Sequence, residues 1–328
     1  MNEDANRTFY EKPVLSIEGQ ADLLMSRGLT GNKRKLCDIL RYVNYYRLTG
    51  FLFPFKILDS ERYQSGITID YLWSLYTFDR RLRGLLFERV SRLEVAFRTV
   101  FAYEHARATN TPFCYAEPYC FDFGHGKGTR KKNEVEERYR EMMKRIDAAI
   151  EQAKNLRFMR HFREKYANKR PPVWMVVEVL SFGILYHYFR LLPRLVQIQI
   201  AHRFGFTERT FCSVLTALNR VRNKCAHHER FLHSKIPTDG IHKYCSARKN
   251  KMLADLDEAL QIDVCYESGS TLYSLVCIMV HLLSIVRPES RWKQRFKDFM
   301  CDPANADGRA RLPVFAESTW ETLALWQT

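Results

Sequence analysis

Glycine and proline are scarce in this sequence of 328 residues, which contains 14 glycines and 11 prolines. Both residues mark turns, so their scarcity argues against a sandwich or barrel, which needs many short strands and turns. Hydrophobic residues make up 46% of the chain, which is enough for a sizeable core. The composition therefore predicts an all-α fold built from long helices.

The sequence also lacks the patterns of export and membrane insertion. Its first ten residues are polar and contain no apolar signal core. The longest apolar run, Val173 to Phe189, is marginal in length for a membrane span and is interrupted by Glu178 and His187. The nine cysteines form no Cys-x-x-Cys pair and lie in apolar stretches, which is typical of reduced thiols in a cytosol. We expect a soluble, cytoplasmic protein without a membrane partner.

Motifs for metals and nucleotide cofactors are missing as well. Cys225, His227 and His228 lie too close together on one helix for a tetrahedral zinc site, and no second Cys/His pair is near in sequence. No Walker loop and no Rossmann glycine pattern occurs. We therefore predict neither a metal nor a cofactor.

Positive charge is abundant, because the formal net charge is +15. An excess of this size attracts a polyanion, either nucleic acid or an anionic membrane surface. Charge alone does not distinguish DNA from RNA, and part of it can be a solvated basic face.

Helical periodicity organises most of the chain. Short helices are predicted over Ser16–Arg27 and after Asn32, and a long helix over about Asp70–Ala106. Further helices are predicted at 133–155, 173–192, 208–233, near Met252, at 271–286 and around Trp292. These elements suggest an N-terminal unit (1–60), a helical core (61–240) and a C-terminal helical extension (241–328).

The segment Leu218–Arg230 combines a packing stripe with a polar cluster. Its apolar stripe advances in steps of three and four residues through Phe211, Val214, Leu218, Val221, Cys225, His228 and Leu232. This periodicity places His228 on the packed face, whereas Asn223 and His227 share a flank. Arg222 and His227 are about 140° apart on an ideal helix.

An arginine and a histidine are sufficient to cleave RNA without a metal. The 2′-hydroxyl attacks the adjacent phosphate, His227 moves the proton and Arg222 holds the phosphate. Asn223, four residues before His227, is placed to orient the imidazole ring. Alternatively, both histidines are satisfied core residues, because this spacing also occurs by chance in helices.

The string Arg222-Asn223-Lys224-Cys225-Ala226-His227 resembles the signature of HEPN ribonucleases, an arginine followed four to six residues later by a histidine. Three further segments resemble the Abi-like abortive-infection proteins of the AbiD/AbiF type. They are Lys12–Leu29, Asn44–Leu48 and Pro172–Gly183, so the resemblance runs from about Lys12 to His233. It implies a HEPN-like helical bundle, RNA as the target and a role in anti-phage growth arrest or a toxin–antitoxin system.

Such sites are built from two motifs, and this chain shows one, which implies a homodimer with a composite site. Arg98 with His105 and Arg157 with His161 miss the spacing or the asparagine of a second motif.

Three more residues are candidates for support of the site. Glu178 is the one acid in a nearly apolar helix and would need a partner if buried, with Arg222 or Arg98 as candidates. Glu94 and Arg98 are four residues apart and are predicted to pair, with either a site role or a structural one.

Basic and aromatic residues are candidates for RNA contacts, and each also has a structural reading as a solvated charge or a packed ring. They are Tyr45, Tyr46 and Arg47, then Lys127, Arg130, Lys131 and Lys132 in a glycine-rich loop, then Arg157, Arg160, Arg163, Lys165, Lys169 and Arg170.

Three functions remain open at this point. The first is a metal-independent endoribonuclease toxin, whose activity a bound non-coding RNA could restrain. The second is an RNA-binding module that scaffolds a structured non-coding RNA with a dormant HEPN site. The third is a DNA-binding regulator that uses the N-terminal helices, for which the sequence offers no clear recognition helix.

Overall fold

The computed structural model describes residues 12–122, 129–234, 254–264 and 272–327. These residues form helices and turns, with two isolated bridges and no strand among them, so the predicted all-α fold is confirmed there. Contacts divide the chain into two units, Met1–Arg80 and Arg81–Thr328. The boundary expected after residue 60 stays a prediction, and the one expected after residue 240 lies outside the described residues.

The N-terminal unit contains three short α-helices that are each capped by a polar side chain. Ser16, Asn32 and Asn44 accept hydrogen bonds from the first turns of the helices that follow them. The predicted first helix ends as expected near Gly28, whose φ of 106° suits glycine. The helices are α1 (Ile17–Ser26), α2 (Lys33–Leu40), α3 (Tyr45–Thr49), the 3-10 helix η2 (Phe53–Phe55) and the start of α4 (Ile69–Thr109).

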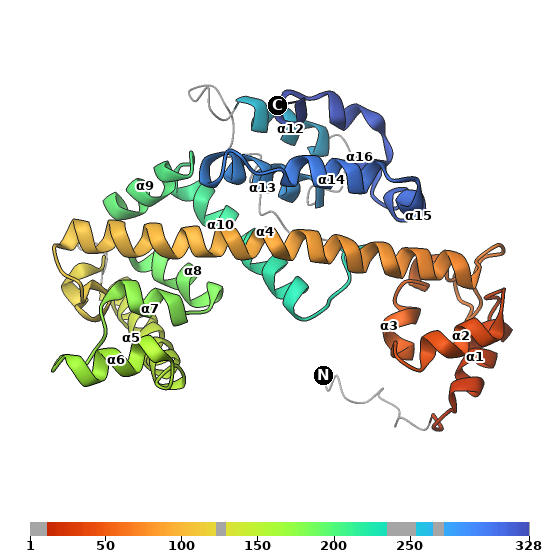
Figure 1. The fold of residues 1–328 in the computed structure, drawn as a ribbon, viewed down its shortest axis with the longest axis horizontal. Helices are drawn as coiled ribbons and strands as arrows, with labels where there is room; N and C mark the ends of the chain where they lie inside the picture. The colour runs from red at the N-terminus through yellow and green to blue at the C-terminus, as the bar shows by residue number, and fades with distance from the viewer. Residues whose placement is uncertain (1–11, 123–128, 235–253, 265–271, 328) are drawn as a thin grey trace. The chain divides into compact units, whose positions relative to one another are not determined.

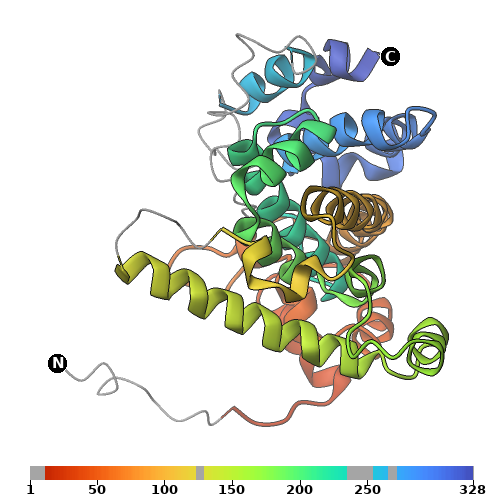
Figure 2. The same cartoon turned by 90° about the vertical axis from the view of Figure 1, so that its left-hand side faces the viewer.

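The second unit holds the rest of α4 and the helices that pack on it. Figures 1 and 2 show α13 and α14 on one side of α4, and α5, α6 and α7 on the other. The helices are α5 (Thr129–Gln152), α6 (Arg157–Lys165), α7 (Val173–Val179), α8 (Phe182–Leu191), α9 (Arg194–Arg203), α10 (Glu208–Ala226), α12 (Ala254–Val264), α13 (Leu272–Val286), α14 (Trp292–Cys301), α15 (Ala306–Arg309), α16 (Pro313–Ala316) and α17 (Ala324–Gln327). Short 3-10 helices η3 (Cys114–Ala116), η4 (Pro118–Cys120), η6 (Pro303–Asn305) and η7 (Ser318–Thr322) connect them.

The C-terminal helices pack directly on this core. The Trp292 indole nitrogen donates to the Leu85 carbonyl on α4 at 3.1 Å, and Trp292 is fully buried. On α13, the His281 ring lies 3.4 Å from the Phe204 carbonyl oxygen. No helix in the described part of the chain is both long enough and apolar enough to span a bilayer.

One expected helix, Val173–Leu192, is divided into α7 and α8. Ser181 adopts an extended conformation and accepts a hydrogen bond from the Ile184 amide, so it begins a new helix. The prediction of one continuous helix was wrong because hydrophobic content does not reveal that a serine acts as a cap.

A cluster of six phenylalanines joins α4, α8, the end of α9 and α10. Phe211 is fully buried, and its ring centroid lies 5.1 Å from Phe204, 5.4 Å from Phe189 and 5.5 Å from Phe97. Phe101 and Phe206 complete the cluster, each with its ring centroid 6.4 Å from that of Phe211. Because the cluster connects four elements, it fixes the position of α10 along the axis of α4.

We expect Phe211→Ala to lower the free energy of unfolding by about 3–5 kcal/mol, because it leaves a cavity among five rings. Phe158 on α6 is 38% exposed, and Phe158→Ala is the matched control, with an expected change below about 1 kcal/mol. Urea unfolding followed by circular dichroism measures both. Equal losses for the two variants would show that the cluster does not hold the unit together.

Candidate active site

Helix α10 and its C-cap carry the Arg222–His227 motif, and the helix begins where its sequence predicts. Thr207 caps its start by accepting from the Thr210 amide at 3.2 Å. The predicted stripe Phe211, Val214, Leu218, Val221 and Cys225 is buried, as expected. This stripe packs on α8, α9 and α13 of the same chain, so it is not an open surface for a second copy.

The helix ends at Ala226, seven residues earlier than predicted, and this changes the place of both histidines. His227 is the C-cap, and its amide donates to the Asn223 carbonyl at 2.8 Å. His228 has a φ of 57° and an exposed side chain. The prediction that His228 packs in the core was therefore wrong, because the left-handed residue turns the chain out of the helical stripe.

The turn that follows α10 is tied down by two cations. The Lys224 ammonium donates to the Glu229 carboxylate and to the Arg230 carbonyl, both at 3.2 Å. Arg83 on α4 donates to the Glu229 carbonyl at 3.1 Å. His227 and His228 are thus displayed on a short turn that is anchored at both ends.

A buried carboxylate on α4 is the centre of the polar cluster beside the motif. Glu94 is 6% exposed, and its Oε1 accepts from Arg98 Nη2 at 2.6 Å, which confirms the predicted pair. Its Oε2 lies 3.5 Å from Arg222 Nε. One carboxylate therefore holds two arginines, one from its own helix and one from α10.

The break between α7 and α8 supplies the next partner. Arg98 Nη2 also donates to the Leu180 carbonyl, at 2.8 Å, and this oxygen is available because the helix is interrupted there. Gly183, just after the break, lies next to Asn219 of α10, whose amide nitrogen is 3.8 Å from the position of an added β-carbon. Asn219 Oδ1 is buried and has no hydrogen-bond partner in the described part of the protein.

Arg222 and His227 keep polar atoms available. Arg222 uses Nε toward Glu94 and Nη1 toward the Asn223 side-chain oxygen at 3.5 Å, and Nη2 has no partner among the described residues. The His227 side chain is exposed and has no partner there either. The side chains of Asn223 and His227 are not joined, so the expected orientation of the ring by Asn223 does not occur within one chain.

Glu178 does not belong to this cluster. Its side chain is exposed, and it lines a shallow cavity of about 430 Å³ together with Tyr103, Arg107 and Trp174. The prediction of a buried Glu178 paired with Arg222 or Arg98 was wrong, because α7 turns this position outward and Glu94 takes the role instead.

His105, in one of the weak candidates for a second motif, is a core residue. It is 1% exposed, and its ring nitrogens lie 2.7 Å from the Tyr188 hydroxyl and 3.1 Å from the Cys120 carbonyl oxygen. Burial lowers the pKa of His105 to about 4, so the ring is neutral at pH 7. Arg157 and His161 of the other candidate are both exposed on α6.

The predicted RNA-contacting residues are distributed over both units. Arg157, Arg160 and Arg163 are exposed on α6, and Lys169 is exposed after it. Arg170 instead forms a two-pronged ion pair with Asp147, at 2.6 and 3.0 Å. Lys127 lies outside the described residues, whereas Arg130, Lys131 and Lys132 belong to α5 rather than to the expected loop. Tyr45, Tyr46 and Arg47 belong to the N-terminal unit.

Sequence reasoning missed Asn219 and the Leu180 carbonyl. Asn219 lies one turn before Arg222, so helical spacing alone could have found it. No sequence pattern predicts a role for the Leu180 carbonyl, because this oxygen is free to bind Arg98 only when Ser181 interrupts the helix. In the described residues, no three His, Cys, Asp or Glu side chains gather in a geometry that could hold a metal ion.

Fold and site define an all-helical protein with a charged cluster between its longest helix and a motif-bearing helix. A family model described as Abi-like protein matches residues 38–233, which is more than half of the chain, and the chain belongs to this abortive-infection family. The match includes the segments Asn44–Leu48, Pro172–Gly183 and Leu218–Arg230, whereas Lys12–Leu29 precedes it. No curated protein and no solved structure gives a match.

Glu94→Gln should lower the free energy of unfolding by about 2–4 kcal/mol, because the mostly buried Arg98 loses its counter-charge. Glu141 pairs with Arg145 in an ion pair whose side chains are 60% and 51% exposed. Glu141→Gln is therefore the control, with an expected loss below about 1 kcal/mol. Chemical denaturation at neutral pH compares them, and a Glu94→Gln protein as stable as the control would contradict the proposed anchoring.

Proposed function

We propose that this Abi-like protein is an endoribonuclease with a HEPN-type centre at Arg222 and His227. The observation that supports this most is the way Arg222 is held. Glu94 binds its Nε, while Nη2 has no partner among the described residues. A fixed guanidinium with free N–H groups is suited to a phosphate, and an exposed histidine follows five residues later.

The reaction requires only these groups and the RNA itself. His227 accepts the proton of the 2′-hydroxyl while the 2′-oxygen attacks the adjacent phosphorus. The bond from phosphorus to the 5′-oxygen breaks, and that oxygen takes a proton from a protonated histidine or from water. The products are a 2′,3′-cyclic phosphate and a 5′-hydroxyl. Arg222 offsets the negative charge that gathers on the phosphoryl oxygens in the transition state.

Glu94 acts through Arg222 and is a positioning residue. Arg98 neutralises the other oxygen of the same carboxylate and ties it to Leu180. The arrangement prevents Arg222 from sampling many rotamers before RNA binds, which lowers the entropic cost of binding the phosphate. In a cell the activity would serve growth arrest during phage infection.

Binding without cleavage is the second candidate, and the surface of α6 favours it. Met159 and Phe162 are buried, while Arg157, Arg160 and Arg163 face solvent. A helix that presents several arginines can follow an RNA backbone without reading its bases. A bound non-coding RNA on this surface would also restrain a toxin, so the two functions are compatible.

Arg222→Ala and His227→Ala should each slow cleavage of a single-stranded RNA by about 10²-fold or more, because each removes a group that acts in the transition state. Arg92→Ala and His202→Ala are the controls, since both side chains are exposed on other parts of the same unit. The assay contains EDTA, because the proposed chemistry uses no metal, and mass spectrometry of the products identifies the cyclic phosphate.

Two results would contradict this mechanism. One is cleavage that stops in EDTA and returns with magnesium. The other is a His228→Asn protein that is folded but inactive while His227→Ala keeps full activity. Asparagine tolerates the left-handed conformation at position 228, so this variant tests the imidazole rather than the turn.

We further propose that two copies assemble next to this centre. Tyr103 on α4 and Trp174 on α7 are 57% and 54% exposed and line one shallow cavity, and Val95, which is 52% exposed, lies about two turns before Tyr103 on α4. Val95 follows Glu94, and α7 leads into Leu180, which binds Arg98, so this apolar patch borders the cluster. Apolar side chains exposed together mark interaction surfaces, and two-fold dimers are the commonest assembly.

Trp174→Glu should convert the dimer into a monomer in multi-angle light scattering and abolish cleavage. Leu195→Glu is the control, because Leu195 is 74% exposed on α9, away from the patch. Mixing Arg222→Ala with His227→Ala should restore about a quarter of the activity, since half of the dimers would contain one intact pair out of two. A wild-type monomer that cleaves RNA at full rate would refute the shared site.

A further inference from the structure

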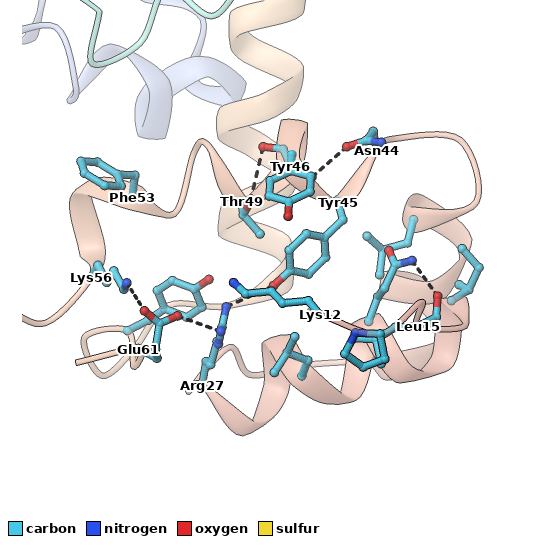
Figure 3. A pocket seen from close by; sticks show the side chains of 16 residues that line it. Lys12, Leu15, Arg27, Asn44, Tyr45, Tyr46, Thr49, Phe53, Lys56 and Glu61 are labelled. Carbon is cyan, nitrogen blue, oxygen red and sulfur yellow. Dashed lines mark hydrogen bonds and ion pairs between the residues drawn. The ribbon is translucent and has the colours of Figure 1, made fainter. Parts of the chain in front are cut away.

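A cavity of about 540 Å³ lies within the N-terminal unit and is separate from the proposed cleavage centre. Its wall is formed by the segment before α1, by α1, by α3 and η2, and by the residues that follow η2 (Figure 3). The volume falls in the range of pockets that enclose small molecules. The side chains of its lining therefore decide which small molecule it would bind.

The lining carries a surplus of positive charge. Lys12, Arg27 and Lys56 contribute three cations, and Glu61 is the one acid among the residues that line the cavity, so the sum is 3 − 1 = +2. The Glu61 carboxylate binds Arg27 Nη2 at 2.7 Å and also binds Lys56. These ion pairs hold the two cations in the wall, and the remaining charge favours an anionic ligand.

Arg27 is fixed from a second direction. Its Nη1 donates to the Tyr45 hydroxyl at 3.2 Å. Burial raises the pKa of Tyr45, so its hydroxyl stays protonated at neutral pH and can donate onward. Figure 3 shows Lys12, Arg27 and Tyr45 converging from three different segments on one region of the cavity.

Aromatic rings form the other part of the lining. Tyr46 packs edge-to-face on Tyr45, with 5.7 Å between ring centroids. Tyr46 and Phe53 are nevertheless 66% and 72% exposed, although both line the cavity. Exposed rings next to fixed cations are the combination that binds a nucleotide, because the rings stack on the base and the cations contact its phosphate.

We propose that this cavity binds one unpaired nucleotide, with its phosphate at Lys12 and Arg27 and its base against Tyr46 or Phe53. The nucleotide is either a free mononucleotide or an unstacked residue of a longer RNA, and the two share this chemistry. The site lies in a different unit from Arg222 and His227, so its ligand binding can be tested without cleavage. It gives the chain a way to select RNA with single-stranded segments.

The experiment uses the full chain with His227→Ala, so that RNA is bound but not cut. A decamer of single-stranded RNA containing 5-iodouridine is photo-crosslinked, and the modified peptide is identified by mass spectrometry. We expect the adduct on Tyr46 or Phe53. Tyr46→Ala and Phe53→Ala should each weaken binding of uridine or adenosine monophosphate, or of the decamer, by about tenfold.

Matched controls come from the same unit. Tyr42 is 92% exposed and does not line the cavity, so Tyr42→Ala should bind as the parent does. Lys12→Ala should weaken binding, whereas Arg34→Ala, which removes one charge at an exposed position of α2, should not. The comparison of Tyr46→Ala with Tyr42→Ala, and of Lys12→Ala with Arg34→Ala, distinguishes binding in the cavity from a general effect of charge or of exposed rings.

The outcomes distinguish the ligand sources. Binding of the mononucleotides at the cavity identifies a nucleotide receptor, and binding of the decamer alone identifies an RNA site; both support the proposal. Crosslinks confined to other peptides, or equal effects of Tyr42→Ala and Tyr46→Ala, would overturn it. So would equal displacement by a hexaglutamate peptide, which carries charge without bases. A protein that binds here but cleaves nothing would refute the nuclease and leave the cavity's role intact.

Discussion

The Glu94 carboxylate, which accepts a hydrogen bond from Arg98 and forms an ion pair with Arg222, connects the parts on which the candidate site depends. A carboxylate that is 6% exposed is unfavourable by itself, and two guanidiniums offset its desolvation. Arg98 extends the connection to the carbonyl at the break between α7 and α8, and Arg222 extends it to α10. Three separate stretches of sequence are therefore held in register by one side chain.

The phenylalanine cluster and the charged cluster have different tasks. The rings around Phe211 stabilise the fold but do not fix the rotation of α10 about its axis, since apolar packing tolerates small rotations of a helix. The contacts of Glu94 have defined geometry, so they select one rotation of α10 about its axis. The phenylalanine cluster thus stabilises α10, and the charged cluster around Glu94 determines its orientation.

Much of the fold could be predicted from the sequence, because helical periodicity and capping residues act locally. The stripe from Phe211 to Cys225, the cap at Ser16 and the pair of Glu94 with Arg98 depend on neighbours within a few turns. The errors arose where distant residues decide. Glu178 was expected inside because its helix is apolar, but which side of a short helix faces the core depends on the elements that cover it. Arg222 found its partner 128 residues earlier in the chain, a distance over which spacing carries no information.

The end of α10 at Ala226 separates the two halves of the motif mechanically. Arg222 belongs to the rigid helix, and its position is determined by the rotation of that helix against α4. His227 belongs to the turn, which is anchored by Lys224 and Arg83 and has its own length. An extra residue in the turn would move the imidazole along the surface and leave the helix unchanged. One inside the helix after Arg222 would instead rotate the buried Cys225 out of its stripe by about 100°. Variation in the number of residues between arginine and histidine is therefore tolerable only on the carboxyl side of Ala226, and related chains with longer spacings are expected to differ in the turn alone.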